Sequence, residues 1–337
     1  MRNKQILAEE TAESLETVGS AAPKKKKFKL KQLDLVRNWQ AYLLSVPAIV
    51  IFFLFSYLPL PGVIMAFKDF NLYDGIYGSP WIEPIFANFE FYFTSTFFLQ
   101  TLRNTFVLNL LNMVFGTVLS VGAAIALNEI LSRKFKRIYQ SILFLPYFFS
   151  VILLGKLVTM FTDTDTGILN TILQAMGADP VVWTDQSFIW LPIVVFVFLW
   201  KNVGYSLIVY LSSISGIDAE IYEAAEIDGA GRMAQIFRIT VPLLVPSIIM
   251  LTLLAIGRIF YGDFQLVYAI VGNDVDMLEY TDIIETFLYR SVMEPPSGVP
   301  QYAMSTAIGL FQTLLGLITI FFSNFFVKLY NKDYALF

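Results

Sequence analysis

The amino-acid sequence predicts an all-α, polytopic membrane protein with six transmembrane helices. Of its 337 residues, 56 % are hydrophobic and only 15 % are charged, whereas about 25 % of the residues in a soluble domain are charged. The mean hydropathy is +0.64. Because lipid cannot satisfy free backbone N–H and C=O groups, long apolar runs are expected to be helical. The composition therefore indicates a chain that crosses a membrane several times.

Six segments reach the length of about 20 apolar residues that a bilayer requires. They cover residues 41–67, 102–127, 139–161, 188–211, 241–271 and 302–328. Residues 1–40 precede them as a tail that is first acidic and then rich in lysine, as expected of a disordered segment that meets anionic lipid headgroups. Residues 41–337 are expected to form the transmembrane domain.

The distribution of Lys and Arg predicts that both termini are cytoplasmic. The tail carries nine of these residues, segment 128–138 carries four, and segment 162–187 carries none. Cytoplasmic loops are enriched in positive charge, so segments 128–138 and 212–240 are assigned to the inside. Segments 68–101, 162–187 and 272–301 are assigned to the outside. An aromatic belt is expected in the first of these outer segments, and solvated acidic charge in the last.

Residue types that are missing from the sequence exclude several functions. The chain has no Cys and no His, so disulfides, thiolate metal sites and imidazole catalysis are excluded. No G-x-x-x-x-G-K-[ST] pattern occurs, and ATP chemistry is therefore not expected on this chain. The absence of a clear internal repeat weakens a secondary transporter built from inverted halves. No metal, cofactor or nucleic acid is expected to bind.

The segment 212–240 carries the most informative pattern, Glu223-Ala-Ala-Glu-Ile-Asp-Gly229, which nine residues separate from Ile239-Thr-Val-Pro242. Asp218 is placed to cap a helix, and Gly229 can adopt the left-handed conformation that ends one. A second short helix is expected over 232–240, with Pro242 opening the next span. The first helix has an apolar stripe through Ala224 and Ala225 that ends at Asp228. The pattern predicts a docking surface, although amphipathicity alone also fits a hairpin packed on its own protein.

This loop resembles that of permease subunits of type I binding-protein-dependent ABC importers, in the maltose-permease superfamily. Val241 stands where the family usually has Leu. The similarity covers residues 100–328, the five-helix permease core, and extends to the first span as an additional N-terminal helix. The runs Tyr42–Pro47, Ala66–Asn71 and Leu102–Thr105 resemble the oligosaccharide and polysaccharide subgroup.

The resemblance implies a non-catalytic transport subunit in a bacterial cell membrane. Glu223 would face a basic group in a cleft of a cytoplasmic ATPase, and Gly229 would allow the bend. The partners implied are a second homologous permease chain, two ATPase subunits or a homodimeric ATPase, an extracellular substrate-binding protein, an oligosaccharide and membrane lipid. ATP and Mg would bind to the ATPase, and no cofactor to this chain.

Polar and aromatic residues inside the spans are candidates for a substrate pathway, because charges are costly in a membrane. Helical spacing over 241–271 places Arg258, Tyr261, Gln265 and Tyr268 on one face and Asp263 elsewhere. Loose matching to the family's helices beside the loop implies that Trp200, Gly204, Phe260, Tyr261 and Asp263 line the pore. The alternative is that the aromatic residues pack between helices, while Arg258 and Asp263 pair within a permease dimer.

Three functions are consistent with these observations. The first is the permease subunit of an ATP-driven carbohydrate uptake system. The second is an ion-coupled secondary transporter that uses Arg258 and Asp263, and the third is an ABC permease for a non-sugar solute. A polytopic enzyme or sensor has the least support, because the chain lacks His, Cys and a paired carboxylate motif in any span.

Overall fold

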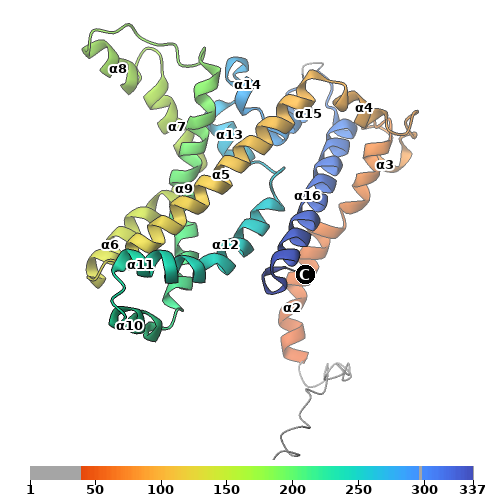
Figure 1. Cartoon of the computed structure of the whole chain (residues 1–337). Helices are drawn as coiled ribbons and strands as arrows, with labels where there is room; N and C mark the ends of the chain where they lie inside the picture. Colours follow the sequence, from red (N-terminus) through yellow and green to blue (C-terminus); the bar gives the residue numbers. More distant parts are fainter. Residues whose placement is uncertain (1–38, 296–297, 337) are drawn as a thin grey trace, which may run out of the picture. The chain divides into compact units, whose positions relative to one another are not determined.

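The computed structural model describes residues 39–295 and 298–336. The regular secondary-structure elements within these ranges are all helices (Figure 1). The tail predicted over residues 1–40 lies outside the described residues up to position 38. The chain divides into two units, residues 1–61 and 62–337. The all-α prediction is confirmed for the described part of the chain.

The first unit contains α2 (Trp39–Phe52), which a π-helical turn, η1 (Phe53–Tyr57), continues. Their large apolar side chains are exposed, as expected of a helix in contact with lipid. Together with η2 (Leu60–Phe67), these residues form an apolar stretch, Tyr42–Phe67, that is long enough to cross a membrane. The first predicted span is therefore confirmed.

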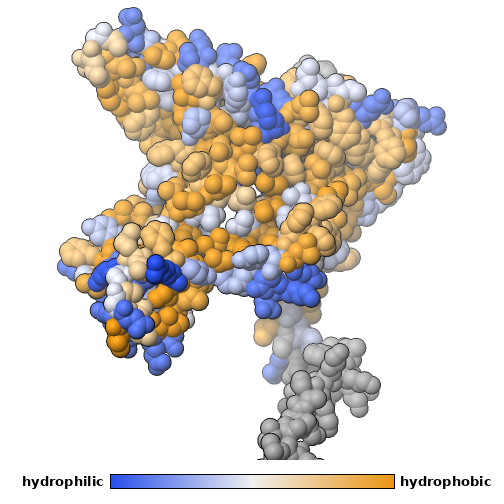
Figure 2. Space-filling model, in the orientation of Figure 1, coloured by the Kyte–Doolittle hydropathy of each residue, from blue (hydrophilic) through white to orange (hydrophobic). Residues whose placement is uncertain are grey.

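In the second unit, three predicted spans are single long helices: α5 (Thr96–Asn128), α9 (Ser187–Ser215) and α16 (Tyr302–Tyr330). The most extensive helix–helix contact in the molecule joins α5 and α9. Leu108 of α5 and Val194 of α9 belong to a core cluster at one end of this pair, and Ala124 and Leu207 belong to a second cluster at the other end. Figure 2 shows hydrophobic side chains covering the middle of these helices, with hydrophilic ones toward their ends.

The third predicted span is bent and not straight. It consists of α6 (Arg133–Phe144), η3 (Leu145–Phe148) and α7 (Val151–Thr162), with an angle of 93° across the break. Pro146 has no N–H to continue the helix, and the Ser150 side chain caps α7 by accepting a hydrogen bond from the Leu153 amide at 3.2 Å. The described residues thus contain five helices of spanning length, or six if the bent pair counts as one.

The fifth predicted span is wrong in its second half. The helix α12 (Val241–Ile256) ends before Gly257, residues 257–263 are irregular, and α13 (Phe264–Val271) starts a new helix (Figure 1). The Asp263 side chain caps α13 by accepting from the Leu266 amide at 3.1 Å. The single helical face predicted for Arg258, Tyr261, Gln265 and Tyr268 therefore does not exist.

The segment predicted as a second short helix over 232–240 is helical, but it is not separate from the next span. The helix α11 (Arg232–Gln235) and the π-helical turn η4 (Ile236–Thr240) run directly into α12, so that Arg232–Ile256 forms one helix of 25 residues. Pro242 lacks the N–H that an unbroken α-helical ladder needs, and a π turn at this point accommodates that loss. Pro242 therefore lies inside the span and does not begin it.

The outer segments are more ordered than predicted. Segments 68–101 and 162–187 contain α3 (Gly75–Gly78), α4 (Ala87–Phe93) and α8 (Ile168–Ala175), and segment 272–301 contains η5 (Val275–Met277), α14 (Leu278–Thr281) and α15 (Ile284–Met293). Asp282 is 1 % exposed, and its carboxylate lies 2.5 Å from the Arg290 guanidinium. The expectation of solvated acidic charge is wrong for this residue, because a half-buried basic partner compensates its charge.

Candidate functional site

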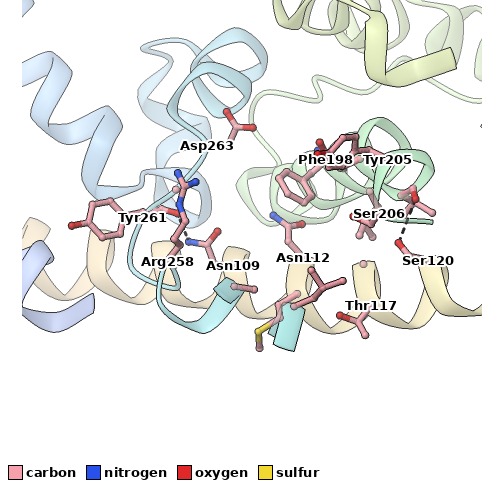
Figure 3. Close-up of a pocket in the computed structure, with 18 of the residues that line it drawn as sticks. Asn109, Asn112, Thr117, Ser120, Phe198, Tyr205, Ser206, Arg258, Tyr261 and Asp263 are labelled. Atoms are coloured by element: carbon pink, nitrogen blue, oxygen red, sulfur yellow. Dashed lines mark hydrogen bonds between the residues drawn. The ribbon is translucent and has the colours of Figure 1, made fainter. Parts of the chain in front are cut away.

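A cavity of about 800 Å³ lies between α5, α9 and the irregular segment 257–263 (Figure 3). Its walls combine amide, hydroxyl and aromatic side chains. The polar and aromatic lining residues are Asn109, Asn112, Thr117 and Ser120 of α5, Phe198, Asn202, Tyr205, Ser206 and Tyr210 of α9, and Arg258, Tyr261, Asp263, Phe264 and Gln265 beyond α12. Pockets of this size and composition bind small organic ligands.

The irregular segment is held by side chains from three other helices. The Asn109 side-chain amide of α5 donates to the Ile259 carbonyl at 2.9 Å and to the Tyr261 carbonyl at 3.0 Å. The Gln312 amide of α16 donates to the Phe260 carbonyl and, at 2.6 Å, to Oε1 of Glu285. The Gly262 amide donates to the same Glu285 oxygen at 2.8 Å. Non-helical backbone persists at membrane depth only where such partners satisfy it.

Glu285 has an unusual environment for a carboxylate. Burial raises the pKa of its carboxyl group, although hydrogen bonds from Gly262 and Gln312 oppose that shift. Its Oε2 is buried and has no hydrogen-bond partner within residues 39–295 and 298–336. A Cβ at position 262 would lie 3.0 Å from this Oε2 and 2.5 Å from Cδ1 of Ile283. A larger residue at position 262 would therefore displace the ends of the Ile283 and Glu285 side chains.

The Asn109 clamp, which consists of the two hydrogen bonds that Asn109 donates to the segment 257–263, makes a testable contribution to the free energy of unfolding. Asn109→Leu leaves two carbonyl groups of the segment 257–263 without a donor, and we expect it to lower the free energy of unfolding by about 1–3 kcal/mol. Asn112→Leu on the same helix is the matched control, because the Asn112 Oδ1 is already buried without a partner among the described residues. Thermal unfolding in detergent should show a lower Tm for Asn109→Leu only. Equal Tm values would contradict the clamp.

The structure brings four of the seven predicted pathway residues to the cavity: Arg258, Tyr261, Asp263 and Gln265. The Tyr261 hydroxyl donates to Oγ1 of Thr313 in α16 at 2.9 Å. Asp263 both lines the cavity and caps α13. These positions are compatible with a pathway role, which stays a prediction.

The other three predicted residues lie away from the cavity. Trp200 borders an apolar groove of about 480 Å³ that Phe161 and Phe196 also line. Phe260 packs against Phe106, with ring centroids 6.0 Å apart. Gly204 faces the backbone of α6, where a Cβ would lie 2.0 Å from the Leu143 carbonyl oxygen. Their surroundings are those of residues that pack between helices or face lipid.

The sequence contained a signal for the cavity residues that were not predicted. Asn109 and Asn112 are three residues apart in an apolar span, and Phe198, Asn202 and Ser206 recur every four residues. Both spacings place the side chains on one helical face. Polar residues in a transmembrane helix usually face the protein interior, so this pattern could have identified the two walls.

The loop between α9 and α12 contains α10 (Ala219–Ile227). The Asp218 side chain accepts from the Glu220 amide at 3.1 Å, and Gly229 has a φ of +78°. The predicted helix cap and the predicted left-handed glycine are therefore confirmed. Of the motif residues in the predicted docking surface, Glu223, Ala224, Asp228 and Pro242 are exposed, whereas Ala225 and Ile239 are half-buried.

Large apolar side chains are exposed around this loop. Ile227 is 87 % exposed, Met233 65 % and Phe237 64 %. A cluster of exposed apolar residues beside charged ones is typical of an interaction surface. The loop therefore has the character of a docking site for another surface.

One contact lies within this loop, and another connects it to the end of α5. The Tyr222 and Thr240 hydroxyls are 2.9 Å apart, which joins α10 to the π turn at the base of α12. Arg232 lies 3.3 Å from Glu129 at the end of α5, but both side chains are substantially exposed, so this ion pair contributes at most about 1 kcal/mol. Since Arg232–Ile256 is one helix, about 37 Å long at 1.5 Å per residue, it connects the loop directly to the cavity wall.

Comparison with known sequences finds relatives over most of the chain. Protein LplB of Bacillus subtilis (strain 168) is 32 % identical over 301 residues, which are 89 % of this chain and 92 % of LplB. The polygalacturonan/rhamnogalacturonan transport system permease protein YteP of the same organism is 30 % identical over 310 residues, covering 92 % of this chain and 94 % of YteP.

A solved structure has the same fold. It is the crystal structure of a bacterial ABC transporter involved in the import of the acidic polysaccharide alginate, and one of its chains matches with a TM-score of 0.77 and 32 % identity over 87 % of this chain and 96 % of that chain. The family model described as the inner membrane component of binding-protein-dependent transport systems matches residues 116–333. The chain belongs to this family of membrane transport components.

Proposed function

We propose that the chain is the translocating permease subunit of an ATP-driven carbohydrate uptake system in a bacterial cell membrane. The observation that carries this proposal is the unbroken helix Arg232–Ile256, which links an exposed apolar docking loop to a polar and aromatic cavity. The family description supports an extracellular binding protein as a partner. The names of YteP and of the alginate transporter support a carbohydrate substrate.

The cavity lining suits a sugar. Sugar rings present C–H faces that pack on aromatic side chains, and Phe198, Tyr205 and Tyr261 supply such surfaces. Hydroxyl groups need directional donors and acceptors, and the side-chain amide of Gln265 supplies both. A cavity of about 800 Å³ accommodates a ligand of drug size, equivalent to an oligosaccharide of a few rings.

The loop has the properties of a surface that binds a cytoplasmic ATPase subunit. Glu223 would pair with a basic group in a cleft of a cytoplasmic ATPase, and the exposed Ile227, Met233 and Phe237 would supply apolar contact. ATP and Mg would be bound by two ATPase subunits or a homodimeric ATPase. ATPase closure would push α10, and the helix Arg232–Ile256 would carry that motion to the cavity wall. A second permease chain would complete the pathway, and both termini of this chain would be cytoplasmic.

Uptake measurements on the purified complex test this function. With an affinity tag on this chain, we expect a second permease chain and an ATPase to co-purify, as identified by mass spectrometry. Proteoliposomes that contain the complex should accumulate an oligosaccharide when the binding protein and ATP are supplied, and an ionophore should not reduce that uptake. Accumulation by this chain alone that collapses with an ion gradient would contradict the proposal and favour the ion-coupled alternative.

A further inference from the structure

We propose that the cavity is specific for oligosaccharides that carry carboxylates, such as those built from uronic acids, and that Arg258 binds the sugar carboxylate. This proposal rests on the proposed function, because it assumes that the cavity conducts carbohydrate. Arg258 is the one basic side chain among the residues that line the cavity. Figure 3 shows it near Asn109, at one end of the row of polar side chains along α5.

The Arg258 guanidinium differs from three other basic groups, Arg103, Arg290 and Lys201, which all have hydrogen-bond or ion-pair partners. Arg103 donates to Asn104 Oδ1 at 3.0 Å and to the Glu279 carbonyl at 2.9 Å, and Arg290 pairs with Asp282. Lys201 donates to two backbone carbonyls, each at 2.9 Å. Arg258 makes no side-chain hydrogen bond or ion pair with any residue that the structure describes, and it is exposed. Its five N–H donors are therefore free to bind a ligand.

The acidic residue of the cavity does not neutralise Arg258. Among residues 39–295 and 298–336, the ion pairs within 4.0 Å are Arg232–Glu129 and Arg290–Asp282, so Asp263 is not paired with Arg258. The Asp263 carboxylate instead accepts the Leu266 amide at the start of α13, where the helix dipole stabilises a negative charge. The cavity thus contains one guanidinium and one carboxylate that are not paired with each other, and Oδ1 of the carboxylate accepts the Leu266 amide.

A uronate matches this arrangement better than a neutral sugar does. A guanidinium binds a carboxylate through two parallel hydrogen bonds, and such charge-assisted bonds are stronger than neutral ones. An unpaired arginine at membrane depth is also costly, and a bound anion removes that cost. Gln265 remains available for the sugar hydroxyls, and Tyr261 for the ring face. We therefore expect a preference of about 10- to 100-fold for the acidic sugar.

Binding measurements without the binding protein test this specificity, because the selectivity of that protein then does not enter. Saturation-transfer NMR on the purified membrane complex would compare 1,4-linked trigalacturonate with the same trisaccharide after reduction of its carboxyl groups. We expect tighter binding of trigalacturonate by the wild type. Arg258→Gln should remove the preference for trigalacturonate over the neutral sugar, and Arg258→Lys should retain part of it. Arg103→Gln, which removes one positive charge outside the cavity, should leave the preference intact.

Several outcomes would overturn the proposal. Equal or tighter binding of the neutral sugar by the wild type would do so, as would an unchanged preference in Arg258→Gln. Equal losses for both sugars in Arg258→Gln, together with a lower Tm of the complex, would show that Arg258 pairs with a partner chain instead. If ATP-driven uptake of a neutral sugar is observed in any of these cases, the proposed function stands and only the acidic specificity fails. Absence of ATP-driven uptake of every sugar would contradict the proposed function itself.

Discussion

Glu223→Ala is expected to abolish ATP-driven uptake while leaving the chain folded in the membrane. Glu223 is exposed on α10 and makes no hydrogen bond or ion pair with any part of the chain that the structure describes. Removing the Glu223 side chain therefore changes the free energy of unfolding of this subunit little, because alanine is also a good helix former. If Glu223 pairs with a basic group in an ATPase cleft, truncation costs about 2–5 kcal/mol of binding, which is 30-fold or more in affinity.

The measurement is uptake and ATP hydrolysis by the reconstituted complex. We expect Glu223→Ala to lose sugar uptake and the stimulation of hydrolysis by the loaded binding protein. Glu226→Ala is the matched control, because Glu226 has the same side chain on the same exposed helix but lies outside the Glu223-Ala-Ala run of the pattern. Wild-type transport by Glu223→Ala, or equal losses in both variants, would contradict a specific coupling role for Glu223.

Gly229 provides a second probe of the same loop. Its φ of +78° is accessible to glycine, and an added Cβ would meet no atom within 4 Å, so any effect of substitution acts through the backbone. Asparagine tolerates this conformation, whereas proline holds φ near −65° and cannot adopt it. Uptake should therefore be largely retained in Gly229→Asn and lost in Gly229→Pro, with both variants inserted in the membrane.

Gly204→Leu is expected to prevent accumulation of the folded protein. A Cβ at this position would lie 2.0 Å from the Leu143 carbonyl oxygen and 2.8 Å from the Phe144 Cα. These are backbone atoms, so α9 would have to separate from the α6–η3 segment. Small residues permit such close approach of transmembrane helices, and overpacking by a whole side chain costs more than about 3 kcal/mol.

Gly204→Ala and Gly122→Ala make a graded comparison. A Cβ at Gly122, in α5, would meet no atom within 4 Å. Fluorescence-detected size-exclusion chromatography should show a reduced folded fraction and a lower Tm for Gly204→Ala but not for Gly122→Ala. A Gly204→Ala protein with the wild-type Tm and impaired uptake would instead support the pathway role that the sequence suggested.

The long spans were predictable because their signal is carried by contiguous residues. Hydropathy alone located α5, α9 and α16, and the cap at Asp218 and the turn at Gly229 depend on neighbouring residues. The break at 257–263 was not predicted, because its signal is carried by residues that are not contiguous. The groups that satisfy its backbone, Asn109 and Gln312, are far away in the sequence, and apolar residues flank the break on both sides.

Local signs of this break were nevertheless present. Gly257 and Gly262 bracket Arg258, and Asp263 precedes an apolar run in the position of a helix cap. One continuous span was predicted from hydropathy despite these signs, because a tilted helix of about 30 residues can also cross a membrane. The fused helix Arg232–Ile256 was missed because Pro242 was interpreted as a helix start, whereas a π turn carries the helix through it.

The clamp around residues 257–263 has a consequence for how the pathway can open. Asn109, Glu285 and Gln312 come from three different helices and hold the same short piece of backbone. A local movement of this segment alone would break hydrogen bonds to all three helices at once. The segment 257–263 is therefore expected to move together with α5, α15 and α16 as one rigid block.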